Sequence, residues 1–259
     1  MQTLRAAAVA GTFYPANPIL LREQITLWCR EGDAPTLPRP VRALLLPHAG
    51  YCYSGAIAAA GIRLLPKQGI KRVLILCPAH HVYLRGMALS SAERFATPLG
   101  EIPLDRAALA GLSHLPGVQI NDEAHRFEHA IEVQLPFLQQ QLGDFSLLPV
   151  VVGETSPSAV AGLLEALMNE QTLLIISSDL SHYLSWQQAR ERDEETLAQI
   201  LALKGDLQGQ QACGCFALNG ALLWARRHKL QASRLAAANS GDTAGDKHRV
   251  VGYAAIAFY

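Results

Sequence analysis

Short apolar runs recur along the chain, and each is followed by a polar or glycine-containing segment. The runs are rich in Val, Ile and Leu, and they occupy residues 41–46, 72–77, 147–152, 173–176 and 250–259. Runs this short and continuous favour β-strands that are buried on both faces, as in a largely parallel sheet.

Helical patterns lie between these runs, at residues 56–65, 123–142, 158–169, 186–203 and 219–228. Pro136 should kink or break the second of them. Alternating strands and helices predict α/β layers joined by right-handed crossovers. We therefore predict a single α/β domain over residues 1–259, with a central, mainly parallel sheet flanked by helices.

Polar residues follow three of the predicted strands. His48 follows the first, His80 and His81 follow the second, and Asp179 and His182 follow a later one. Ligands of open α/β sheets bind outside the carboxyl ends of the strands. Because parallel strands end at the same edge of a sheet, these residues are predicted to line one pocket.

Each of these residues also has a local interpretation. His48 could form a hydrogen bond within its own loop, and Asp179 could cap a turn. His182 could act as a general acid or base, because the pKa of histidine lies near neutrality. Neighbours in extended chain point to opposite sides, so one of His80 and His81 should face the site and the other should brace it.

A further histidine pair lies in the sequence HRFEHAIEVQ. His125 and His129 are four residues apart, with Glu128 and Glu132 nearby. On one helix this spacing can bind zinc, although a solvated helix face is the more common explanation. His129 and Glu132 could still reach a pocket together.

Cys213 and Cys215 are separated by one glycine in ACGCFALNG. This is not a C-x-x-C motif, so neither a thioredoxin motif nor a zinc knuckle fits. One thiolate could be a soft metal ligand or a redox group, or both could be small buried residues before a helix. Five cysteines, an odd and unevenly spaced set, argue against a disulfide framework and for a reducing compartment.

Composition excludes several classes of partner. The formal net charge is zero, and the absence of a basic block makes nucleic acid a poor candidate. No segment approaches the ~18 consecutive apolar residues of a membrane span, and the first residues lack the apolar region of a signal peptide. We expect a cytoplasmic protein without nucleic-acid or membrane partners.

Seven short motifs together resemble one known family. They are AGTFYPAN (10–17), PHAGYCYSG (47–55), CPAHHVY (77–83), EHAIEVQLPFL (128–138), SSDLSHY (177–183), ACGCFAL (212–218) and VVGYAA (250–255). In this order, over nearly the whole chain, they are similar to those of the Memo family, whose bacterial and archaeal members are called AmmeMemoRadiSam system protein B.

The resemblance implies a fold like that of LigB-type (class III) extradiol dioxygenases, which are non-haem iron enzymes. By motif, the family's metal ligands fall on His48, His80 and Cys213. Cys213 would replace the carboxylate ligand of the dioxygenases, and the nearby Cys215 leaves the choice of sulfur open.

The resemblance also implies the residues around the metal. Asp179 and His182 match the family's pocket residues, and His129 matches the histidine of its H-x-I-E motif. His81 is then expected to support the ligands or to act in catalysis, and not to be a ligand itself. The predicted catalytic set is His182, Asp179, His129 and His81.

Two imidazoles and a thiolate leave coordination positions open, as in catalytic sites. The set suits iron, copper or zinc, and the resemblance makes iron the first choice. We predict a metal-dependent, dioxygenase-like oxidoreductase of unknown substrate. The alternatives are a non-catalytic protein that uses the pocket to bind a peptide or partner protein, and a zinc hydrolase. The family's bacterial name implies radical SAM and AMMECR-type partner proteins.

Overall fold

The computed structural model describes residues 3–32, 35–112 and 114–259. Its strands form two sheets. The larger contains β2 (Ala43–Leu46), β3 (Arg72–Pro78), β4 (Met87–Leu89), β7 (Val118–Ile120), β8 (Ser146–Val152), β9 (Thr172–Ser177), β10 (His182–Leu184), β11 (Ala232–Asn239) and β12 (Val250–Phe258). The smaller contains β1 (Leu4–Arg5), β5 (Arg94–Thr97) and β6 (Gly100–Pro103).

The larger sheet has a parallel centre, an antiparallel pairing on each side of that centre, and a further parallel pair, β4 and β7, at one edge. Its strand order is β10–β12–β2–β9–β3–β8–β4–β7, and β11 pairs with β12. The strands β2, β9, β3 and β8 are parallel neighbours, whereas β12 runs antiparallel to β2 and β4 antiparallel to β8. β12 follows β11 without an intervening crossover helix, and such a short connection can join only antiparallel strands.

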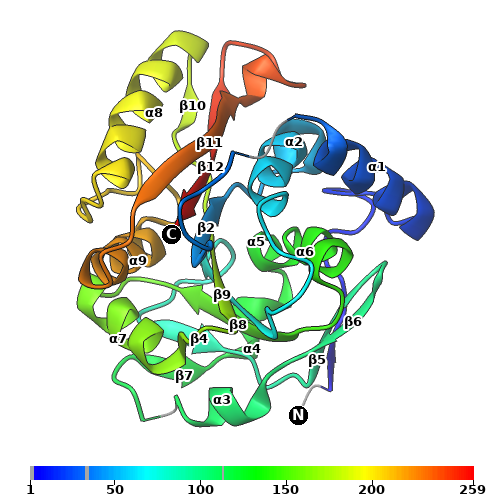
Figure 1. Ribbon diagram of the computed structural model, residues 1–259, viewed down its shortest axis with the longest axis vertical. Coiled ribbons are helices and arrows are strands. Elements are labelled where there is room, and N and C mark those ends of the chain that lie inside the picture. Colours follow the sequence, from blue (N-terminus) through cyan, green and yellow to red (C-terminus); the bar gives the residue numbers. More distant parts are fainter. Residues whose placement is uncertain (1–2, 33–34, 113) are drawn as a thin grey trace.

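Helices cover both faces of the larger sheet. Figure 1 shows α7, α8 and α9 on one side of the strands and α1, α2, α5 and α6 on the other. The helices are α1 (Pro18–Arg30), α2 (Tyr51–Ile62), α3 (Arg106–Ala110), α4 (Asp122–Arg126), α5 (His129–Glu132), α6 (Leu135–Leu142), α7 (Pro157–Leu167), α8 (Trp186–Leu201) and α9 (Cys215–Arg227). The prediction of an α/β fold with a central sheet flanked by helices is confirmed.

The helical segment predicted over residues 123–142 is interrupted just before Pro136, as expected, but it also has a second break at Glu128 that the pattern did not predict. Three short helices, α4, α5 and α6, occupy this segment. The chain is extended at Glu128 (φ −70°, ψ 116°), whose side chain caps α5 by accepting the N–H of Ala130. His125 and His129 therefore lie on different helices and do not form a pair. Pro136 sits in the first turn of α6, where proline is tolerated.

The strand order brings three chain segments to one edge of the sheet. β9 lies between β2 and β3 and runs parallel to both. The loops that carry His48, His80 and Asp179 follow the carboxyl ends of these three strands. Within the described ranges, no helix is both long enough and apolar enough to cross a bilayer.

Candidate metal centre

His48 lies in the loop between β2 and α2 and is 2% exposed. Its Nδ1 is 3.0 Å from the Oγ of Ser177. That hydroxyl donates to the carbonyl oxygen of Ala130 at 2.7 Å and accepts from the Nε2 of Gln134 at 3.0 Å. Because a hydroxyl has one proton, which Ala130 already receives, Nδ1 of His48 must be the donor. The Nε2 of His48 is then unprotonated and has a lone pair available for a metal.

His80 follows β3, and its orientation is set by Glu128. The backbone N–H and the Nδ1 of His80 both lie 2.8 Å from carboxylate oxygens of Glu128. The same carboxylate accepts the N–H of Ala130 at 2.9 Å. Burial alone would raise the pKa of Glu128, but the hydrogen bonds that its carboxylate accepts from His80 and Ala130 lower this pKa to about 2. An ionised carboxylate only accepts, so Nδ1 of His80 donates to it and Nε2 is left free.

Cys213 lies just before α9. Its Sγ is 3.3 Å from the Nε2 of His48 and 3.6 Å from the Oγ of Ser178. The segment is fixed on both sides, because the N–H of Cys213 donates to the carbonyl of Asp179 at 3.3 Å and the N–H of Gly214 donates to Ser178 at 2.9 Å. These bonds hold the thiol against the ends of β2 and β9.

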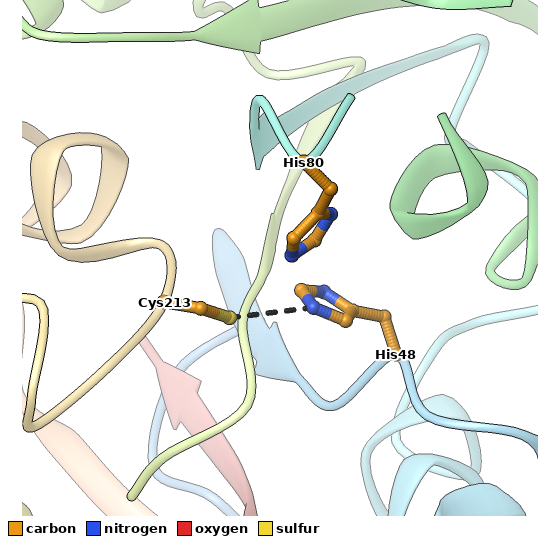
Figure 2. Close-up of side chains that lie close together, drawn as sticks. All are labelled: His48, His80 and Cys213. Carbon is orange, nitrogen blue, oxygen red and sulfur yellow. Dashed lines mark hydrogen bonds between the residues drawn. The ribbon is translucent and has the colours of Figure 1, made fainter. Parts of the chain in front are cut away.

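The three predicted ligands come together in space. One ligand atom from each of His48, His80 and Cys213 lies within 4.8 Å of the other two, and Figure 2 shows the two rings and the sulfur facing a common space. A tetrahedral ion with bonds of about 2.3 Å to sulfur and about 2.0 Å to nitrogen holds those two atoms about 3.5 Å apart. The observed 3.3 Å between sulfur and nitrogen therefore fits joint coordination with little movement.

The protonation states of these groups also fit a metal centre. Burial, with a smaller effect of the charge on His80, lowers the pKa of His48 to about 3, so its ring is neutral. Burial and the charge of Asp179 raise the pKa of the Cys213 thiol to about 12. This thiol is protonated at neutral pH until a cation displaces its proton. It is therefore not an activated nucleophile in its metal-free form.

His129 is the first residue of α5 and borders the centre. Its ring stacks on that of His80 at 4.7 Å between centroids and meets that of His48 edge-on at 5.4 Å. Phe13 contacts the same ring at 4.7 Å. Burial, with a smaller effect of the repulsion that His48 would exert if both rings were protonated, lowers the pKa of His129 to about 3. His129 thus contributes a neutral imidazole beside the three ligand atoms.

Asp179 holds two of the loops together. Its carboxylate accepts the N–H of His48 at 2.7 Å, and its carbonyl accepts the N–H of Cys213 at 3.3 Å. Burial raises the pKa of this carboxyl to about 6. The structure therefore places Asp179 behind the ligands, where it ties the His48 loop to the Cys213 loop.

His182 begins β10 and faces the centre from another side. Its Nδ1 donates to the carbonyl of Leu180 at 2.9 Å, which leaves Nε2 free to exchange a proton. His81 is exposed, and its ring lies 6.1 Å from that of His129. Of the predicted catalytic residues, His81 is the most peripheral.

Two clefts reach Cys213. One, of about 540 Å³, is lined by His80, His182, Tyr183, Leu184, Arg192, Gly209, Gln210 and Cys213. The other, of about 270 Å³, is lined by Pro78, Ala79, Val82, Tyr83, Leu84, Val152, Gly153, Glu154, Cys213, Gly214 and Phe216. The larger lies within the size range of small-molecule sites, and it joins two ligand residues to His182.

Comparison with known proteins identifies the family. The sequence model described as "Memo-like protein" matches residues 5–257. The chain belongs to the Memo family. Proteins named MEMO1 family protein are similar over 98% of this chain: that of Methanosarcina acetivorans is 38% identical over 98% of its own length, and that of Sulfolobus acidocaldarius is 33% identical over 99%.

A solved structure shares the fold. An uncharacterized protein from Escherichia coli K12, JW3007, superposes with a TM-score of 0.54 at 13% sequence identity. The match covers 85% of this chain and 100% of that one. At this identity the similarity concerns the arrangement of helices and strands alone.

Two polar residues of this Memo-family centre had no assigned role in the sequence-based prediction. Glu128 orients His80, and Ser177 fixes the tautomer of His48. Glu128 directly precedes a predicted site histidine, and a carboxylate beside metal-binding histidines is a common orienting partner. Ser177 is the last residue of β9 and has no comparable signal. Cys215 starts α9 and is not part of either candidate ligand group among the described residues, which are His48, His80 and Cys213, and His80, Glu128 and His129.

Proposed function

We propose that His48, His80 and Cys213 bind one divalent metal ion, iron first and copper or zinc otherwise, and that this centre catalyses a redox reaction of a small molecule. The observation that carries the proposal is the convergence of two imidazoles and one thiol within 4.8 Å. These three groups come from segments far apart in the sequence, and each has its own hydrogen-bonded support.

Each residue has a distinct task in the proposed enzyme. Bound iron or copper would supply redox chemistry at the coordination positions that three protein ligands leave open. Glu128 and Ser177 hold the two imidazoles in the tautomers that present Nε2. His182 transfers a proton at its free Nε2. The buried Asp179 holds the His48 loop and the Cys213 loop together through its hydrogen bonds to both.

Elemental analysis of untagged protein purified without oxygen tests the proposal. We expect close to one equivalent of iron or copper, which His48→Ala and Cys213→Ser abolish. Cys215→Ser is the matched control, because this buried thiol is only two residues away but lies outside the candidate ligand groups among the described residues. Its metal content should not change.

The other outcomes are equally informative. One equivalent of zinc, lost in the same two variants, would retain the centre and replace redox chemistry with hydrolysis by a zinc-bound water. Folded protein without metal under all conditions would contradict the proposal. It would favour the alternative in which the pocket binds a peptide or a partner protein, such as the radical SAM and AMMECR-type proteins that the family name suggests.

A further inference from the structure

The larger cleft contains a guanidinium group that the proposed chemistry does not use. Arg192, on α8, lines this cleft together with His80, His182 and Cys213. Among the described residues that line it, none is Asp or Glu. The cleft therefore combines one fixed positive charge with the ligands of a cation, and this combination favours a negatively charged occupant.

Among the described residues, no carboxylate lies within ion-pair distance of the Arg192 side chain. Its acidic neighbours on α8 are Glu191, Asp193, Glu194 and Glu195. Glu194 pairs with Arg234 at 2.7 Å, and buried Asp193 accepts the N–H of Ser181 at 3.0 Å. Within residues 3–32, 35–112 and 114–259, no ion pair includes Arg192. Its planar fork of N–H donors is thus available for a carboxylate or a phosphate.

Tyr183 forms an aromatic wall of the same cleft. Its backbone is in the left-handed region (φ 60°), which is unfavourable for a side chain of this size, and its side chain is 65% exposed. The ring lies 5.7 Å from that of His182 and 4.9 Å from the guanidinium of Arg249. Surrounding structure therefore holds an exposed ring between a cation and a candidate catalytic histidine.

We propose that this cleft binds a small organic anion, with its carboxylate or phosphate group on Arg192 and its apolar part along Tyr183. The apolar part would then extend towards His182 and the metal ligands. This inference names the substrate class of the proposed centre and so rests on the proposed function. The guanidinium is present with or without a metal, so anion binding can be measured separately from metal binding.

Three aromatic probes test the proposal: benzoate, phenyl phosphate, and benzamide, which is uncharged and close to benzoate in shape. Their dissociation constants are measured by calorimetry on the full chain, metal-loaded and metal-free, with metal content determined in parallel. We expect at least one anion to bind at least tenfold more tightly than benzamide. Arg192→Gln should reduce this preference to less than twofold without changing metal content.

Arg190→Gln is the matched control, because it removes the same charge from the same helix at a residue that packs on Trp186 outside the cleft. It should keep the preference. The anion that binds more tightly identifies the head group. The proposal would be overturned if the wild-type protein bound neither anion more tightly than benzamide. It would also be overturned if Arg192→Gln kept the preference for the anion, or if Arg190→Gln lost that preference to the same extent as Arg192→Gln. Arg192-dependent anion binding by protein that takes up no metal would support it while the metal proposal fails.

Discussion

At the scale of single residues, the centre depends on groups that fix histidine tautomers. His48 and His80 both present Nε2 because their Nδ1 atoms are engaged by Ser177 and Glu128. Loss of such a partner leaves the ligand in place but lets its ring rotate or change tautomer. Metal affinity should therefore respond to residues that never touch the ion.

Glu128→Gln tests this dependence. The amide cannot accept both the ring and the backbone N–H of His80 as a carboxylate does, so we expect metal affinity to fall about 10–100-fold. Competition with a chelator of known affinity measures the change. Glu123→Gln, at an exposed residue of α4, is the control and should have no effect. Equal affinity of the wild type and Glu128→Gln would refute the orienting role.

The assignment of His182 is separable from metal binding. His182 lines the cleft and its Nδ1 is occupied by Leu180, so His182→Ala should reduce turnover by about 10²–10⁴-fold while metal content stays constant. Oxygen uptake in a screen of catechol-like and thiol substrates measures turnover. His228→Ala, which alters an exposed histidine paired with Glu165, is the control. Undiminished turnover in His182→Ala would remove His182 from the mechanism. If His182→Ala also bound a peptide or partner protein as tightly as the wild type, the alternative of a non-catalytic binding protein would be favoured.

At the scale of elements, the position of the thiol depends on the entry to α9. Gly214 packs against the end of β9 so closely that a Cβ there would lie 2.8 Å from the Cβ of Ser178. No side chain fits without displacing one of the two segments. The glycine between the two cysteines therefore has a packing role, and it determines where Cys213 can be.

Gly214→Ala should displace the thiol and weaken the centre. We expect about 1–3 kcal/mol of destabilisation from overpacking, together with a reduced metal content. Denaturant unfolding and elemental analysis measure the two effects. Gly209→Ala, in the same connection but with nothing within 4 Å of the added Cβ, is the control and should change neither. Full metal content in Gly214→Ala would contradict the prediction, because it would mean that the segment around Cys213 accommodates the added Cβ without displacing the thiol.

At the scale of the whole molecule, buried neutral histidines make stability depend on pH. His125 is 1% exposed, and its Nε2 lies 3.0 Å from the carbonyl of Ala88. Burial lowers the pKa of His125 from 6.5 to about 4. The folded state therefore binds fewer protons than the unfolded state between these values, and stability is lost as the pH falls through this window.

For metal-free protein, we expect His125 alone to account for about 3 kcal/mol of lost stability between pH 6.5 and pH 4. His48 and His129 add losses of the same sign, because their pKa values are also lowered. His125→Gln removes one titrating group, so its unfolding free energy should fall less steeply over this window. Urea unfolding at several pH values measures both slopes, and identical slopes would contradict the prediction.

The sequence by itself determined the parts of this protein that depend on local pattern. Continuous Val, Ile and Leu runs specified the buried strands β2, β3, β8 and β9, because only a strand covered on both faces tolerates such a run. The same pattern placed His48, His80 and Asp179 just beyond strand ends. With the family motifs, it also indicated Cys213 as a ligand.

Only the tertiary structure decided how these residues meet. The order β2–β9–β3 places Ser177 next to His48. The order of strands in a sheet cannot be predicted from the local pattern of hydrophobic and polar residues. Glu128 is extended between α4 and α5, where it caps α5 and holds His80, a partner 48 residues away. Its pairing with His80 across that distance, and not helix propensity, broke the predicted helix and separated His125 from His129. Long-range hydrogen bonds and packing outweigh local preferences here, because a buried carboxylate must find its partners wherever the fold supplies them.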